Sequence, residues 1–154
     1  MWRLHPITEA DIDQILAIER HSFEDPWPRM TFVQELSNGN ASNYAVRHHS
    51  PGLSKDIIGY ICFQVFSGKM HISKVAVALE WRGQGIASWL INACLKRVVK
   101  KGARAAFLEV RGSSISAVKL YLKLGFDIVE KRKNYYLNPK EDALVMMKIL
   151  KEGS

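Results

Sequence analysis

The chain has 154 residues, close to the roughly 150 residues of one typical domain. It is 47% hydrophobic and 24% charged, which excludes a disordered tail, a collagen-like repeat and a coiled coil. Lys and Arg (22) exceed Asp and Glu (15), giving a net charge of +7. This balance suits acidic partners such as nucleic acid, a phosphorylated cofactor or the ribosome, or else reflects a solvated basic surface. No RNA- or DNA-binding signature accompanies it, so we expect no direct nucleic-acid contact.

No membrane, secretion or metal signal is visible. The longest apolar run, from 57 to 66, is shorter than the ~20 residues of a membrane span. The first six residues lack the apolar core of a signal peptide, so we expect a cytoplasmic protein with no membrane partner. Cys62 and Cys94 form no C-x-x-C pair and no cluster with zinc spacing, which predicts reduced, packed thiols and no metal.

The first half of the chain predicts two helices followed by an antiparallel meander. Thr8 and Asp11 form a variant of the capping box that marks a helix start. Pro28 is suited to open a second helix, and the Ser67-Gly68 pair indicates a hairpin. The expected segments are helices from 12 to 19 and from 28 to 37, a loop from 21 to 28, a strand from 44 to 47, a polar loop from 48 to 55, and strands from 56 to 66 and from 70 to 78.

After residue 80 helices and strands alternate. The expected segments are a turn from 82 to 87, helices from 88 to 101 and from 114 to 124, and strands from 105 to 110, from 127 to 130 and from 143 to 150. Gly102 and Gly125 are suited to end the two helices. A strand, helix, strand order requires at least one parallel pairing. The sequence therefore predicts one domain over 1–154, with a mixed α/β sheet of six or seven strands and four helices.

The sharpest local feature is Arg82-Gly83-Gln84-Gly85-Ile86-Ala87, between a strand and a helix. Small residues let the backbone approach a ligand, and a helix N-terminus offers unpaired N–H groups that suit a pyrophosphate. No Gly-Lys-Ser/Thr follows, so the segment is not a Walker loop. Ser88 stands where a dinucleotide fingerprint needs Gly or Ala. A plain strand-to-helix turn is the alternative.

The strand Val75-Ala76-Val77 followed by Arg82-x-x-Gly85-x-Ala87 resembles the acetyl-CoA motif of the GNAT acetyltransferases, written Q/R-x-x-G-x-G/A. Leu108-Glu109-Val110-Arg111 and Leu120-Tyr121-x-x-Leu124-Gly125-Phe126 resemble the second half of that family. A narrower set resembles the N-terminal acetyltransferases of the bacterial ribosomal-protein alanine type and their archaeal relatives. It consists of Ser22-Phe23-x-x-Pro26-Trp27, Asn134-Tyr135-Tyr136 and Glu141-Asp142-Ala143-x-x-Met146. The resemblance covers about residues 3 to 150.

The resemblance implies a GNAT fold, whose largely antiparallel sheet is splayed at its centre, and it implies acetyl-CoA as cosubstrate. The strand at 75–77 would hold the pantetheine arm, and the amides of 83–88 would hold the pyrophosphate. Ser114 stands where the family usually has Asn. The implied cofactor-binding residues are Val75, Ala76, Val77, Arg82, Gly83, Gln84, Gly85, Ile86, Ala87, Ser88, Ser114 and Tyr121.

The resemblance also implies catalytic roles: Glu109 as general base and Tyr121 as general acid for the leaving thiolate, with a backbone N–H at 75–77 as oxyanion donor. An α-amine with a pKa of ~7.7–8 is more easily deprotonated than a lysine amine near ~10.4, so a carboxylate base suits an N-terminal acceptor. His71 is either an alternative base or a structural residue. The implied acceptor-binding residues are Phe23, Glu24, Trp27, Tyr135 and Tyr136, which could otherwise be ordinary loop and hairpin side chains.

The expected activity is transfer of acetyl from acetyl-CoA to the N-terminus of a ribosomal or other protein by direct attack in a ternary complex. One alternative acceptor is a lysine, a polyamine or a small-molecule amine. A second alternative is a non-catalytic coenzyme A-binding or ribosome-associated module, and a dinucleotide-binding protein is a distant third. The sequence leaves the preferred N-terminal residues and the oligomeric state open.

Overall fold

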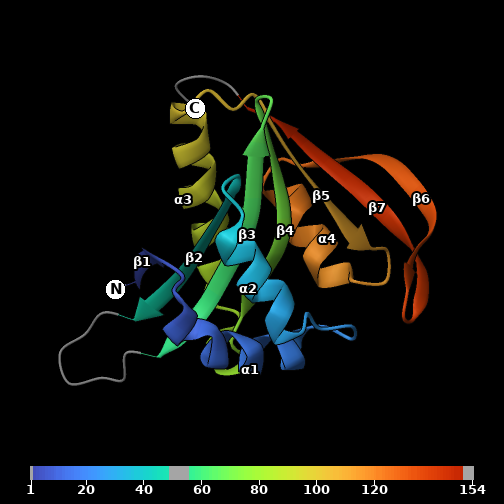
Figure 1. Cartoon of the computed structure of the whole chain (residues 1–154). Coiled ribbons are helices and arrows are strands. Elements are labelled where there is room, and N and C mark those ends of the chain that lie inside the picture. Colours follow the sequence, from blue (N-terminus) through green and yellow to red (C-terminus); the bar gives the residue numbers. More distant parts are fainter. Residues whose placement is uncertain (1, 49–55, 151–154) are drawn as a thin grey trace.

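A computed structural model describes residues 2–48 and 56–150, and the expected loop at 49–55 lies outside them. The described strands form one seven-stranded sheet in the order β1-β2-β3-β4-β5-β7-β6 (Figure 1). The strands are β1 (Trp2–Pro6), β2 (Ala41–His48), β3 (Ile57–Phe66), β4 (Lys69–Val77), β5 (Ala105–Arg111), β6 (Asp127–Leu137) and β7 (Lys140–Ile149). The α-helices are α1 (Ile12–Ser22), α2 (Arg29–Ser37), α3 (Ile86–Lys100) and α4 (Ile115–Lys123).

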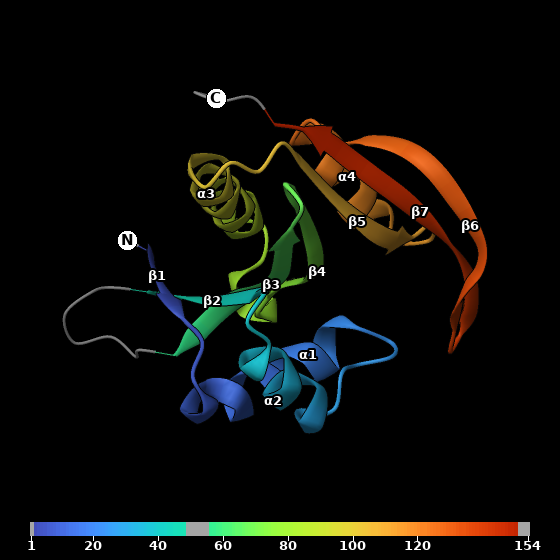
Figure 2. The same ribbon diagram turned by 45° about the horizontal axis from the view of Figure 1, so that its top comes forward.

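Two helices cover each face of the sheet, α1 and α2 on one side and α3 and α4 on the other (Figure 2). The predicted helix start is confirmed: the Thr8 N–H donates to the Asp11 carboxylate at 2.9 Å, and a short 3-10 turn leads into α1. The buried residues of α1 and α3 recur at helical spacing, so each helix packs one apolar stripe against the sheet.

The sheet splits at its centre. β4 and β5 are parallel, and their pairing covers only 69–71 with 105–107 among the described residues. Beyond that point the two strands diverge, as Figure 2 shows. On the other side of β4, Cys62 pairs with Lys74 and Phe63 with Ile72, so Ser73 forms a bulge just past the split. This confirms the predicted parallel pairing and central splay.

Several predicted boundaries were wrong. The edge strand β1 was not predicted, and β2 extends to 41–48 rather than 44–47. The strand predicted at 127–130 continues to Leu137, and its partner begins at Lys140 rather than 143. β6 is polar and exposed along most of its length, so its pairing with β7 defines it and hydrophobic alternation does not. The helix predicted from 88 begins at Ile86, directly after Gly85.

Candidate active site

The phosphate loop is shaped by two glycines in the left-handed region. Gly83 has φ +78° and Gly85 has φ +82°, and a Cβ at either position would meet no atom within 4 Å. Glycine is therefore used here for backbone conformation and to leave the surface open, not to fit against the protein itself. Because α3 begins at Ile86, its first N–H groups and its positive dipole end face this open surface. The arrangement suits an anion such as a pyrophosphate.

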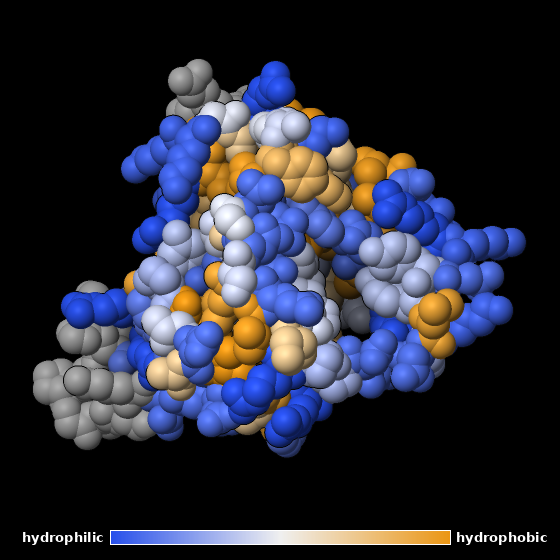
Figure 3. Space-filling view, in the orientation of Figure 1, coloured by the Kyte–Doolittle hydropathy of each residue, from blue (hydrophilic) through white to orange (hydrophobic). Residues whose placement is uncertain are grey.

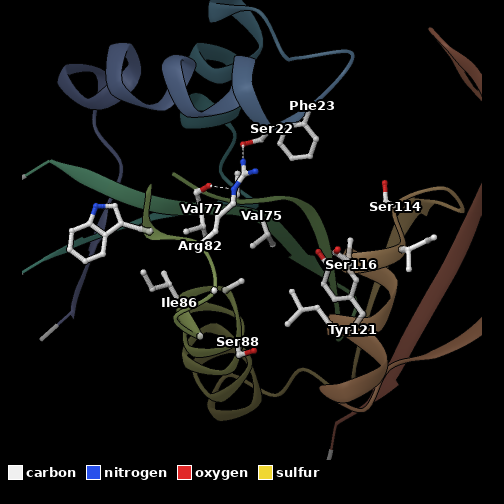
Figure 4. Close-up of a pocket in the computed structure, with 18 of the residues that line it drawn as sticks. Ser22, Phe23, Val75, Val77, Arg82, Ile86, Ser88, Ser114, Ser116 and Tyr121 are labelled. Atoms are coloured by element: carbon white, nitrogen blue, oxygen red, sulfur yellow. Dashed lines mark hydrogen bonds between the residues drawn. The ribbon is translucent and has the colours of Figure 1, made fainter. Parts of the chain in front are cut away.

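A cavity of about 710 Å³ opens beside this loop, between the N-terminal ends of α3 and α4 (Figure 4). It is lined by Ser22, Phe23, Val75, Ala76, Val77, Trp81, Arg82, Gly83, Gly85, Ile86, Ala87, Ser88, Ser113, Ser114, Ile115, Ser116, Ala117, Leu120 and Tyr121. All of the predicted cofactor-binding residues except Gln84 are therefore brought together at one cavity. Because β4 and β5 diverge beyond 71, the edge of β4 that faces β5 is unpaired at 75–77 and lines the cavity.

Arg82 links the phosphate loop to the end of α1. Its Nε donates to the Val77 carbonyl at 3.0 Å, and its Nη2 donates to Ser22 Oγ at 3.0 Å (Figure 4). The guanidinium thus fixes the shape of the loop in addition to adding positive charge beside the cavity. The motif at 82–87 predicts a cofactor-binding role for Arg82, but it does not reveal these contacts with Val77 and Ser22.

Glu109 lies at the mouth of the splay, on β5, with its side chain 10% exposed. His71 Nε2 lies 2.9 Å from its Oε1, and the Tyr135 hydroxyl donates to the same oxygen at 3.2 Å. Burial raises the pKa of Glu109, but the hydrogen bond and charge of His71, with smaller effects of Tyr135 and Arg132, outweigh it and lower the pKa below its ordinary value. The carboxylate is therefore ionised at neutral pH and able to accept a proton.

Tyr121 projects from α4 into the space between α3 and α4 (Figure 4). Its ring packs edge-on against Phe126 at 5.7 Å between centroids. Burial, with a smaller effect of Tyr136, raises the pKa of Tyr121 to about 12. The hydroxyl therefore keeps its proton at neutral pH and can donate it.

The β6–β7 hairpin brings two predicted acceptor-binding residues next to β5. Tyr135 contacts Glu109 directly, and its ring meets that of Tyr136 at 5.0 Å. The Arg111 guanidinium lies 4.2 Å from the Tyr136 ring centroid and donates to the Pro139 carbonyl at 2.7 Å. Figure 3 shows a hollow in the surface between α2 and this hairpin. The residues around the hollow are mainly hydrophilic.

The loop after α1 carries the other predicted acceptor-binding residues. Phe23 lines the cavity, Trp27 is partly buried, and Glu24 is exposed. Lys74 Nζ lies 3.6 Å from the Phe23 ring centroid and 5.1 Å from that of Trp27. Lys74 was not among the predicted site residues, because no local pattern places a β4 lysine against a loop nearly fifty residues earlier in the chain.

Neither cysteine lines the cavity. Burial raises the pKa of Cys94 to about 12 and that of Cys62 well above its ordinary value, so both thiols are poor nucleophiles. Within 2–48 and 56–150, no three His, Cys, Asp or Glu side chains are arranged to hold a metal ion. Over the same residues, no helix is both long enough and apolar enough to cross a membrane.

Residues 12–126 match the acetyltransferase (GNAT) family, and the chain belongs to it. It is therefore an acetyltransferase, and the matched residues include β4, the phosphate loop, α3, β5 and α4. An N-alpha-acetyltransferase of Saccharolobus solfataricus is 32% identical over 153 residues, covering 91% of this chain and 88% of that protein.

Two solved structures share the fold of this chain. The ribosomal-protein-S18-alanine N-acetyltransferase of Escherichia coli has a TM-score of 0.84 and 25% identity, covering 100% of this chain and 97% of that chain. Arabidopsis thaliana NAA60 in complex with acetyl-CoA has a TM-score of 0.85 at 19% identity, covering 97% and 99%. The second likeness supports the fold alone.

Proposed function

We propose that this protein transfers the acetyl group of acetyl-CoA to the α-amino group of protein N-termini, as one domain acting in the cytoplasm. The observation that carries the proposal is the contact between Tyr135 and Glu109. A residue predicted to line the acceptor groove lies against the residue predicted to be the base. The names of the relatives support the same acceptor class, and ribosomal proteins are the first candidates.

The residues of the cavity fit acetyl-CoA. The positive end of α3 and the open surface at Gly83 and Gly85 suit the pyrophosphate, and the unpaired side of β4 at 75–77 suits an extended arm with amide groups. The cosubstrate supplies the acetyl group as a thioester. Tyr121, which also lines the cavity, is the group that we propose to face the thiol.

The chain's own groups then have defined tasks. Glu109 accepts the proton that the acceptor amine must lose before it can attack, directly or through one water. A backbone N–H at 75–77 stabilises negative charge on the carbonyl oxygen. Tyr121 donates its proton to the departing sulfur. Direct attack in a ternary complex is favoured because both cysteines are buried away from the cavity.

The test is consumption of acetyl-CoA with peptides that begin with Ala, Ser, Met-Leu or Met-Glu, each with a free and with a blocked α-amine. Turnover restricted to free N-termini supports the proposal. Equal turnover of blocked, lysine-containing peptides would move the acceptor to a side-chain amine. Coenzyme A binding without turnover on any amine would favour a binding module.

A further inference from the structure

A buried ion pair lies beneath the acceptor loop, which we define as residues 23–27. Lys74 Nζ lies 2.8 Å from Glu19 Oε2, and the two side chains are 11% and 0% exposed. Burying two opposite charges gives little net stability compared with apolar residues of similar size, so packing alone does not explain this pair. The other contacts of Lys74 and Glu19 indicate that the pair holds the acceptor loop in place.

Glu19 holds the end of the acceptor loop. The Trp27 N–H donates to Glu19 Oε2 at 2.8 Å, and the Tyr60 hydroxyl donates to Oε1. The carboxylate of α1 is thus shared by the loop, by β3 and by the Lys74 ammonium of β4. These hydrogen bonds compensate the burial of the charge and give it one geometry.

Lys74 holds the aromatic side chains of the same loop. Its ammonium lies over the Phe23 ring at 3.6 Å and near the Trp27 ring at 5.1 Å, within cation–π range of both. The loop is therefore attached to one cation by two rings and, through Glu19, by one backbone N–H.

The position of Lys74 connects this attachment to catalysis. Lys74 directly precedes Val75, which lines the cavity, as does Phe23. The bulge at Ser73 sets the strand so that Ala76 packs with the α1 side while Val75 packs with the α3 side. Lys74 itself does not line the cavity.

We propose that Lys74 is a positioning residue for the acceptor: with Glu19 it holds the acceptor loop against β4, in register with the cavity wall. The proposal rests on the N-terminal acetyltransferase activity proposed above. Loss of the ammonium frees the loop and weakens acceptor binding. Binding of acetyl-CoA should change less than acceptor binding, because Phe23 is the one residue of the acceptor loop that lines the cavity.

The experiment compares Lys74→Met, Lys74→Arg and Lys148→Met. Lys148 is the matched control, because it is a partly buried lysine whose ammonium also has a fixed partner. Its Nζ donates to the carbonyl of Leu124, at the end of α4, at 2.6 Å. Lys74→Met should raise the acceptor KM by about 30-fold, the size of a desolvated cation–π contact. The value of kcat should stay unchanged, and coenzyme A affinity should change less than the acceptor KM. Lys74→Arg should restore the acceptor KM, and Lys148→Met should leave it unaltered. The double variant Lys74→Met with Glu19→Gln covers the case in which the lone buried carboxylate prevents folding, and its acceptor KM should also rise.

Amide hydrogen exchange of segment 22–28 gives a readout that needs no activity. Exchange should be faster in Lys74→Met than in wild type, and normal in Lys74→Arg and Lys148→Met. An unchanged acceptor KM and unchanged exchange in Lys74→Met would overturn the proposal, as would a fall in coenzyme A affinity equal to that for the acceptor. If wild type acetylates no free N-terminus, the proposed function fails, and the exchange arm still decides whether Lys74 holds the loop.

Discussion

His71 is the last β4 residue paired with β5, and its Nε2 lies 2.9 Å from Oε1 of Glu109, two residues beyond its partner Phe107. A carboxylate only accepts hydrogen bonds, so Nε2 carries the proton in this contact. The imidazole ring stacks on Phe107 at 4.6 Å between centroids, which fixes its direction. His71 is thus a partner of Glu109 at the opening of the sheet, and it keeps the carboxylate ionised.

Replacing Glu109 by Gln should lower kcat/KM for a free N-terminal peptide by about 10²-fold or more at neutral pH, because the general base is lost. The deficit should narrow above pH ~8, where the α-amine deprotonates unaided. Initial rates against pH measure both effects. Glu130→Gln, on an exposed part of β6, is the control and should keep wild-type rates. A Glu109→Gln enzyme with normal rates at neutral pH would remove Glu109 from the mechanism.

Replacing His71 by Phe should change how stability depends on pH, because Phe keeps a ring on Phe107 but removes the hydrogen bond to Glu109. A lowered folded-state pKa stabilises the protein above the ordinary Glu pKa of ~4.3, and this contribution is lost as pH falls through the lowered value. The stability gap between wild type and variant should therefore be larger at pH 7 than at low pH. Urea unfolding at several pH values measures it, and a constant gap would contradict this account.

The order of elements and the phosphate loop could be predicted because each rests on local signals. Apolar spacing marks α1 and α3, and the glycines after Arg82 mark the loop. The edge strands could not be fixed in this way. β1 has five residues and lies beside β2, with Trp2 edge-on to Trp89 at 5.8 Å, so tertiary contacts define it.

Replacing Tyr121 by Phe should lower kcat by about 10²-fold while leaving the affinity for acetyl-CoA unchanged, because the ring remains and only the proton donor is lost. With its pKa raised to about 12, the wild-type hydroxyl stays protonated throughout the assay range. Steady-state kinetics with binding calorimetry separates the two quantities. Tyr44→Phe, whose ring stacks on Phe63 away from the cavity, is the control. A normal kcat in Tyr121→Phe would assign the leaving-group proton to another source.

Replacing Gly85 by Ala should lower the affinity for coenzyme A, whereas replacing Gly102 by Ala should not. Both substitutions should lower the free energy of unfolding by similar amounts. Gly102 offers a matched control, because both glycines have positive φ (+82° and +94°) and open space at the Cβ position. Each substitution forces Ala into the left-handed region at a cost of about 1–2 kcal/mol. Only Gly85→Ala adds a methyl group to the surface assigned to the pyrophosphate. Calorimetry with coenzyme A and urea unfolding test this, and equal coenzyme A affinity in both variants would contradict the assignment.

The site residues, like the helices and strands, fall into two groups: those that local motifs predict and those that only tertiary contacts reveal. Glu109, Tyr121 and Tyr135 could be proposed from the sequence because each belongs to a local motif that resembles the family's. The contact between Glu109 and Tyr135 depends on the strand order, in which β7 lies between β5 and β6. The Lys74–Glu19 pair joins residues of β4 and α1, and its components look like an ordinary surface lysine and glutamate when read along the chain.

The central claim is that the acceptor is an α-amine, and the site of the acetyl group in the product tests it most directly. A peptide with a free N-terminal Ala and an internal Lys is incubated with wild-type protein and acetyl-CoA, and the product is sequenced by tandem mass spectrometry. We predict acetyl on the N-terminal fragment alone, formed about 10²-fold more slowly by Glu109→Gln at neutral pH. Acetyl on the lysine, with the N-terminus unmodified, would contradict it.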